Sequence, residues 1–409
     1  MPVAFHRHQL PNGLTIVAEV DPDAHTAAAG FFVRTGARDE APPLMGVSHF
    51  LEHMMFKGTA RRTAEDVNRE FDELGAKYNA YTTSEITCFY AQVLPERLDN
   101  ATDILADILR PALRDDDFTT EKGVILEEIA MYRDQPFWNL YERAMEEHYG
   151  LHTLAHRVLG TNETVGALTS AQMREYFENR YSADNTTVAL AGRLDFDHCV
   201  KHIGRLCADW QTTRPARDAA QPPSPKGASF VIEDEKVTRA YWLMISPAPS
   251  AQDPRRYAAM MLAQVLGGTD NSRLHWALIE TGVAEEAQAA YDPRDGCGDT
   301  FVFASGDPER IDEIIQIANR EIDNLVASLT PEDLQRLRNR LATGVTLAGE
   351  RPGGRMQRIG RLWTYNREYR TLEQELDAIN AVTLDDLRKV SKDFPFSVRT
   401  VGLLKPKNA

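Results

Sequence analysis

Three ionisable side chains are spaced so that they would share one face of a helix. His49, Glu52 and His53 occupy positions i, i+3 and i+4, which lie above one another on an α-helix. Two neutral imidazoles one turn apart can bind one Zn²⁺, and a carboxylate between them can act on a water molecule at that ion. The order His-x-x-Glu-His reverses the commoner His-Glu-x-x-His zinc helix. The spacing therefore indicates metal-assisted hydrolysis.

The stretch that carries these residues, 46–59, has an apolar background that favours a buried helix. The apolar residues around the ionisable ones are Val47, Phe50, Leu51, Met54 and Met55. Burying ionisable groups among such side chains costs free energy unless a partner compensates them, and a metal ion is one such partner. A lone buried histidine is more often a core residue than a ligand, so the zinc hypothesis needs a third protein ligand.

A carboxylate source lies further along the chain, in a helix expected after the acidic run 115–117. Glu121 and Glu128 are seven residues apart, or two helical turns, and therefore share a face of that helix. This face offers the missing third ligand. Glutamates on helix surfaces are common, so the pair alone does not establish a metal site.

A polar strand follows the helix expected between the capping residue Thr63 and Gly75. Residues 79–93 alternate with a period of two, which predicts a strand. Its first part, from Asn79 to Glu85, is polar for a core strand. It is consistent with an edge strand that pairs with an extended peptide, and equally with an ordinary exposed edge.

Composition limits the class of protein. A length of 409 residues predicts two domains, and 43% hydrophobic with 26% charged residues is typical of a soluble globular protein. The net charge of −15 disfavours nucleic acid and anionic membranes as partners. We expect a cytoplasmic protein, because the sequence shows no secretory signal, no long apolar run and no paired cysteine motif. The four cysteines are Cys88, Cys199, Cys207 and Cys297.

The chain reads as two related α+β halves, each a mostly antiparallel sheet packed with helices. The predicted N-terminal half is 1–212, the Pro- and Ala-rich linker is 213–228, and the C-terminal half is 229–409. The expected strand 240–246 repeats 27–34. An apolar helix at 256–266 repeats the zinc helix without its ligands, so chemistry is expected in the first half alone.

Residues 46–59, Asn79-Ala80 and the pair Glu121 and Glu128 together resemble the pitrilysin-type metallopeptidases, which carry the inverted zinc motif (inverzincins). The resemblance covers nearly the whole chain, and in length the chain is most similar to the β subunit of mitochondrial processing peptidase and its bacterial relatives. It implies one Zn²⁺ per chain. The implied roles are zinc ligands for His49, His53 and Glu128, general base for Glu52, and a supporting acidic residue for Glu121. Glu127 is the alternative third ligand.

The resemblance also implies two halves that face each other like a clam shell around an enclosed chamber. Asn79 and Ala80 would lie on the strand that pairs with substrate, and Arg273 in the second half is a candidate substrate contact or a structural residue. One departure is Glu285, where the family usually has tyrosine.

We therefore expect a zinc-dependent endopeptidase that hydrolyses unfolded peptides, as a homodimer or as a heterodimer with a related subunit. Three alternatives remain: a catalytic subunit that is active only beside a different partner, a non-catalytic peptide-binding or structural subunit, and a metal storage or sensor protein.

Overall fold

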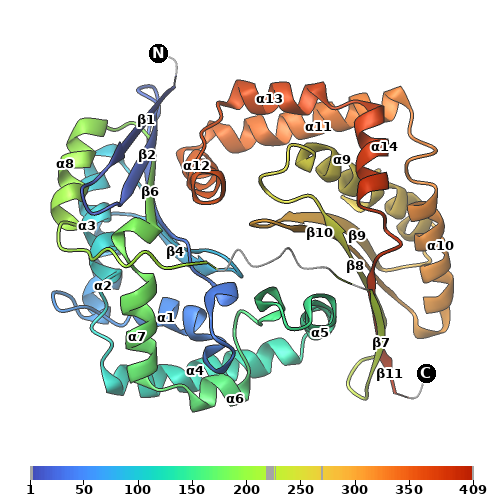
Figure 1. The fold of residues 1–409 in the computed structure, drawn as a ribbon, viewed down its shortest axis with the longest axis horizontal. Coiled ribbons are helices and arrows are strands. Elements are labelled where there is room, and N and C mark those ends of the chain that lie inside the picture. Colours follow the sequence, from blue (N-terminus) through green and yellow to red (C-terminus); the bar gives the residue numbers. More distant parts are fainter. Residues whose placement is uncertain (1–2, 218–224, 226, 269, 408–409) are drawn as a thin grey trace. The chain divides into compact units, whose positions relative to one another are not determined.

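A computed structural model describes residues 3–217, 225, 227–268 and 270–407 (Figure 1). The chain divides into two compact units, each made from three stretches of sequence. Unit 1 comprises Met1–Ala130, His156–Asp218 and Thr346–Arg370, and unit 2 comprises Met131–Ala155, Ala219–Val345 and Thr371–Ala409. About half of the predicted linker, residues 218–224 and 226, lies outside the described residues.

Unit 1 is built on a six-stranded sheet with the order β1-β2-β6-β3-β5-β4. β2 and β6 run parallel, and the other neighbours run antiparallel. The central strands β3 and β6 are buried at every position, so both faces of the sheet are covered. The strands are β1 Ala4–Gln9, β2 Thr15–Val20, β3 Ala27–Val33, β4 Lys77–Thr82, β5 Thr87–Val93 and β6 Thr186–Gly192.

Helices pack on both faces of this sheet. Phe31 on one face joins the main core of the unit, whereas Phe32 on the other face packs with Met356 and Trp363 of α12. The helices are α1 Val47–Met55, α2 Ala64–Glu73, α3 Leu98–Ile108, α4 Asp115–Arg133, α6 Asn162–Ala167, α7 Ser170–Arg180, α8 Phe196–Leu206 and α12 Pro352–Asn366. The last residues of α4 belong to unit 2.

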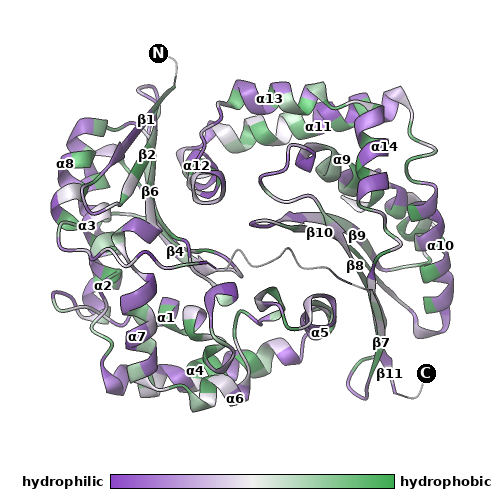
Figure 2. Ribbon diagram, viewed as in Figure 1, coloured by the Kyte–Doolittle hydropathy of each residue, from purple (hydrophilic) through white to green (hydrophobic). Residues whose placement is uncertain are grey.

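Unit 2 is built on a five-stranded sheet with the order β7-β11-β8-β10-β9. The strands are β7 Ala228–Asp234, β8 Ala240–Ala248, β9 Glu286–Pro293, β10 Gly298–Gly306 and β11 Thr400–Pro406. The helices are α5 Pro136–Tyr149, α9 Arg256–Gly267, α10 Ile311–Asp323, α11 Pro331–Glu350, α13 Leu372–Ala381 and α14 Leu384–Asp393. α11 ends in unit 1. Figure 2 shows hydrophilic and hydrophobic residues alternating around helices such as α10, as expected for helices with one buried face.

The predicted fold is confirmed, and the internal repeat extends to strand order. β2 beside parallel β6 corresponds to β7 beside parallel β11, and antiparallel strands continue each sheet in the same sequence order. The tripeptide Pro-Glu-Arg stands at the same place in both units, at 95–97 before α3 and at 308–310 before α10.

The compact units depart from the predicted ranges 1–212 and 229–409 by an exchange of helices. α5 precedes the predicted linker yet packs on the unit 2 sheet, where Phe137 contacts Phe303. α12 follows the predicted linker yet packs on the unit 1 sheet. Each sheet has two apolar faces, and burying the second face removes additional apolar area from water.

The prediction of one strand over 79–93 is wrong in detail. The segment forms the hairpin β4–β5, and the backbone turns at residues 83–86, where Thr83 Oγ1 accepts hydrogen bonds from the amides of Glu85 and Ile86. β4 is the edge strand of its sheet, as predicted. Within the described residues, no helix combines the length and apolar character needed to cross a bilayer.

Candidate active site

Helix α1 holds His49, Glu52 and His53, and its first turn is fixed by a buried carboxylate. Gly46 precedes the helix with φ 95°, a left-handed conformation that glycine adopts without strain. Glu40 Oε2 accepts a hydrogen bond from the Gly46 amide at 2.7 Å, and Glu40 Oε1 accepts one from the Ser48 amide at 2.8 Å. These are donors that a helix N-terminus otherwise leaves unpaired.

Three potential ligand atoms converge between α1 and α4. One nitrogen or oxygen from each of His49, His53 and Glu128 lies within 4.8 Å of the others. Glu128 Oε2 is 3.8 Å from His49 Nε2 and 3.6 Å from His53 Nε2. These separations exceed a hydrogen bond. They are close to the separation of about 3.4 Å expected between two atoms that each bind one tetrahedral zinc ion at about 2.1 Å.

Glu121 orients His53 from behind this cluster. Its Oε1 lies 2.9 Å from His53 Nδ1, and its Oε2 lies 2.6 Å from Lys57 Nζ. A carboxylate only accepts hydrogen bonds, so the ring hydrogen of His53 is placed on Nδ1 and the lone pair on Nε2 faces Glu128. Metal-binding histidines are commonly held in this way. Glu121 therefore does not join the three converging groups. Its contact with His53 fits the predicted supporting role in catalysis, which is to position that histidine.

The His49 side chain is buried and makes no hydrogen bond to the described residues. Its Nδ1 is buried without a partner, and Nε2 is the atom that faces Glu128. Burial, followed by the nearby charge of His53, lowers the pKa of His49 to about 3. The ring is therefore neutral at ordinary pH, which is the form that binds metal. Nε2 is then an unprotonated donor that faces Glu128, and an ion there would be bound by a nitrogen and a carboxylate oxygen, so the donor set fits zinc.

Glu52 lies on the same face of α1 and contacts strand β4. Thr82 Oγ1 donates a hydrogen bond of 2.5 Å to Glu52 Oε2. Burial raises the pKa of Glu52, and the hydrogen bond from Thr82 opposes that shift. A carboxylate with a raised pKa next to a metal site is suited to accept and return a proton near neutral pH. The sequence analysis missed Thr82, which stands only three residues beyond Asn79.

The remaining predicted residues divide between the units. Asn79 and Ala80 lie on edge strand β4, and Asn79 Oδ1 accepts a hydrogen bond from the Ala80 amide. Glu127, the alternative third ligand, is exposed and does not belong to the converging group.

Arg273 and Glu285 belong to unit 2. Arg273 Nη1 donates to Ser328 and to the Asn324 carbonyl, so the predicted alternative of a structural arginine has hydrogen bonds to support it. Glu285 forms an ion pair with Arg239.

Comparison with known proteins agrees with this geometry. Residues 15–162 match the insulinase family, peptidase family M16, and residues 167–341 match the inactive domain of peptidase M16. The chain is 33% identical to an uncharacterized zinc protease of Streptomyces coelicolor, over 98% of this chain and 90% of the relative. It is 27% identical to the uncharacterized zinc protease YmxG of Bacillus subtilis, over 98% of both chains.

Solved structures share the fold. A protease from Helicobacter pylori superposes with a TM-score of 0.92 at 18% identity, covering 99% of this chain and 100% of its own. An M16-like peptidase from Alicyclobacillus acidocaldarius superposes with a TM-score of 0.87 at 22% identity, covering 99% of both chains. This chain therefore belongs to peptidase family M16, a family of pitrilysin type whose members include zinc proteases.

Proposed function

We propose that this protein is a zinc-dependent endopeptidase that hydrolyses unfolded peptides and binds one zinc ion per chain. The convergence of His49, His53 and Glu128 beside Glu52 carries the proposal. When bound there, zinc would act as a Lewis acid on the scissile carbonyl and would make water a stronger nucleophile.

The side chains around the ion perform the proton transfers and the positioning. Glu52 accepts a proton from the attacking water and returns it to the leaving amine. Glu121 holds His53 in the tautomer that leaves Nε2 free, and Lys57 holds the other oxygen of Glu121. Glu40 fixes the start of α1 and so sets the rotation of the helix face that carries all three α1 residues.

Edge strand β4 supports the proposed peptide substrate. An extended peptide can add to a free strand edge through main-chain hydrogen bonds, which require no particular side chain. Asn79 and Ala80 lie on this strand, three and two positions before Thr82, which touches Glu52. A folded protein does not present such a strand, so unfolded peptides are the expected class. Enclosure of the peptide by the two halves and contact with Arg273 stay predictions of the family resemblance.

The test pairs metal analysis with peptide cleavage on the purified chain alone. We expect about one zinc per chain, cleavage of a quenched fluorescent peptide, loss of cleavage on chelation and recovery when zinc is restored. His53→Ala and Glu128→Gln should lose both zinc and activity, because each removes a ligand. Glu127→Gln removes a neighbouring exposed carboxylate and is the matched control that keeps both.

The same experiment decides between the proposal and its alternatives. If the chain binds zinc but cleaves peptide only after a second, related subunit is added, the result would favour a catalytic subunit of a heterodimer. Zinc without cleavage under either condition would favour a peptide-binding, structural or metal-storage protein. Absence of zinc would overturn the site.

A further inference from the structure

The carboxylate of Glu52, the proposed general base, is held by one residue of another element, Thr82 of β4. Glu52 has three rotatable side-chain bonds and is only partly buried. Within the described part of the chain, its carboxylate receives one hydrogen bond, from Thr82 Oγ1 at 2.5 Å. Thr82 is the last residue of β4 and lies 30 positions from Glu52 in sequence.

The alternation of β4 directs Thr82 toward α1. Tyr78 and Ala80 pack against the main core of unit 1, which contains α1, whereas Tyr81 packs against the cluster around α12. Residues two apart on a strand share a face, so Thr82 faces the same side as Ala80. Tyr81 on the opposite face donates a 2.8 Å hydrogen bond to Gln357 of α12.

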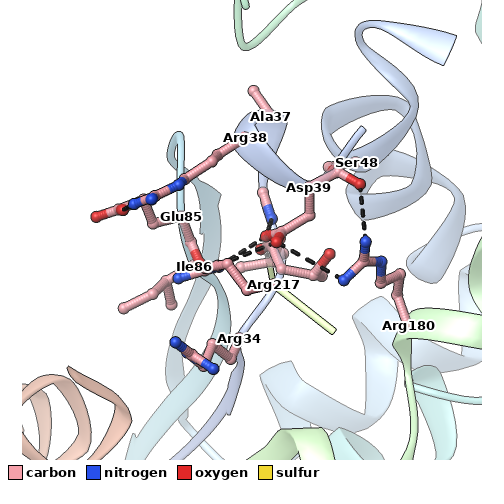
Figure 3. A network of polar contacts seen from close by, with 12 residues as sticks. Arg34, Ala37, Arg38, Asp39, Ser48, Glu85, Ile86, Arg180 and Arg217 are labelled. Atoms are coloured by element: carbon pink, nitrogen blue, oxygen red, sulfur yellow. Dashed lines mark hydrogen bonds and ion pairs between the residues drawn. The ribbon is translucent and has the colours of Figure 1, made fainter. Parts of the chain in front are cut away.

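The turn after Thr82 is also fixed, by buried charges. Arg38 Nη1 lies 2.5 Å from Glu85 Oε1, and Tyr365 donates to Glu85 Oε2 at 3.0 Å. Figure 3 shows Arg38 extending to Glu85 and Arg217 placed between Asp39 and the backbone of this turn. Arg217 Nη2 bonds Asp39 Oδ2 at 2.6 Å and the Glu85 carbonyl at 2.5 Å. The strand end that carries Thr82 is therefore a rigid support.

We propose that Thr82 is a positioning residue for Glu52, so that the strand offered to a peptide also sets the orientation of the general base. The proposal rests on the proposed peptidase function and adds a residue to it. A peptide paired with β4 would lie against the same strand that holds Glu52, so the placement of the peptide and of the base would depend on one element. In this role Thr82 acts through its hydrogen bond to Glu52.

The experiment compares three variants of the full-length zinc-loaded protein. Thr82→Val keeps the shape of the side chain and removes the hydroxyl, and Thr82→Ser keeps the hydroxyl. Thr87→Val is the matched control: Thr87 faces Thr82 across the hairpin, and its hydroxyl bonds the Thr35 carbonyl instead of a site residue. For each variant kcat, KM, zinc content and Tm are measured.

We expect Thr82→Val to lower kcat by about tenfold to a hundredfold, with KM, zinc content and Tm near wild type. A small misplacement of the general base slows the chemical step without weakening substrate binding. Thr82→Ser should restore kcat. Thr87→Val should lower Tm and leave kcat unchanged.

Two outcomes would overturn the proposal while leaving the peptidase assignment intact. One is a Thr82→Val enzyme with wild-type kcat. The other is a loss of kcat that Thr82→Ser does not restore, or a loss of kcat together with a lowered Tm. In either case Thr82 would support only the strand. If wild type itself shows no cleavage while zinc is bound, the proposed function is wrong, and the role of Thr82 in positioning a general base is overturned with it.

Discussion

Helices α1 and α9 occupy equivalent places in the two units but bury different chemistry. Each follows a central antiparallel strand, β3 or β8, and packs against the core of its unit. α9 buries tyrosine, alanine, methionine and leucine, and from Arg256 to Gly267 it contains no histidine, aspartate or glutamate. α1 places His49, Glu52 and His53 in the corresponding position.

The long helices α4 and α11 repeat this difference. α4 supplies Glu121 and Glu128 to the site, whereas α11 carries no carboxylate between Leu334 and Gly349. Because unit 2 builds the same topology without a histidine or a carboxylate in these stretches, the fold does not require the ionisable residues of unit 1. Their burial costs free energy that apolar residues would not. Function, and not packing, therefore accounts for them.

The substitution Glu52→Gln on α1 is expected to have the largest effect, which is a loss of kcat. The amide keeps the size of the side chain and can no longer accept a proton, so kcat should fall by about 10²- to 10⁴-fold. Zinc content should stay at one per chain, because Glu52 is not among the three converging groups. Steady-state cleavage of a fluorescent peptide and metal analysis measure the two quantities.

Glu65→Gln is the control for that substitution. Glu65 lies exposed on α2, and the same change of acid to amide there should leave kcat unchanged. If Glu52→Gln cleaves as fast as wild type, Glu52 is not the base and the difference between α1 and α9 concerns metal binding only.

Local signals in the sequence were sufficient to predict most helices and strands, and to predict which side chains share one face of α1. The capping pair Thr63 and Asp66 marks the start of α2, and Thr383 marks that of α14 in the same way. The period of α1 placed two histidines together, and the period of α4 placed Glu121 and Glu128 on one face. Period alone could not show that Glu128 meets the histidines from one side while Glu121 meets His53 from the other.

Contacts between distant segments were beyond such signals. The sequences of α5 and α12 show that each helix has an apolar face, but they do not show which of the two sheets that face covers. Glu40 caps α1 from six residues before Gly46, outside the usual capping positions. The β4–β5 turn has no glycine, proline or asparagine to mark it, so the hairpin read as one strand and the contact of Thr82 with Glu52 was not apparent.

A smaller effect is expected for Glu121→Gln, which tests whether α4 contributes more than a ligand. Removing the carboxylate behind a metal-binding histidine typically weakens metal binding by about tenfold to a hundredfold. We expect that loss in chelator competition, with cleavage restored by excess zinc. Glu127→Gln on the exposed side of the same helix should behave as wild type. Unchanged zinc affinity in Glu121→Gln would limit the role of Glu121 to its ion pair with Lys57.

The last comparison concerns stability and not catalysis. The carboxylates at the starts of α1 and α9 have pKa values that shift in opposite directions. Burial raises the pKa of Glu40 to about 8, against the opposing bonds from the Ser48 and Gly46 amides. A hydrogen bond from the Arg255 side chain lowers the pKa of Asp253, which lies in the turn before α9. Zinc-free protein is the appropriate sample, because zinc binding would add its own dependence on pH.

The signs of the two dependences follow from proton uptake. Between about pH 4.5 and 8 the folded protein keeps a proton on Glu40 that the unfolded chain releases, so this contribution to stability is complete below that range and is lost as pH rises through it, by at most about 1.4 kcal/mol per pH unit. Asp253 contributes stability above about pH 4 that is lost as pH falls.

Urea denaturation of zinc-free Glu40→Gln and Asp253→Asn across this range separates the two cases. Glu40→Gln removes the titrating group, so its free energy of unfolding should decline less than that of wild type between about pH 5 and 8. Asp253→Asn should differ from wild type at neutral pH and converge with it in acid. If the curve for Glu40→Gln runs parallel to that of wild type, Glu40 is ionised in the folded protein. Its two amide bonds would then outweigh its burial, and the starts of α1 and α9 would be held by the same charged form.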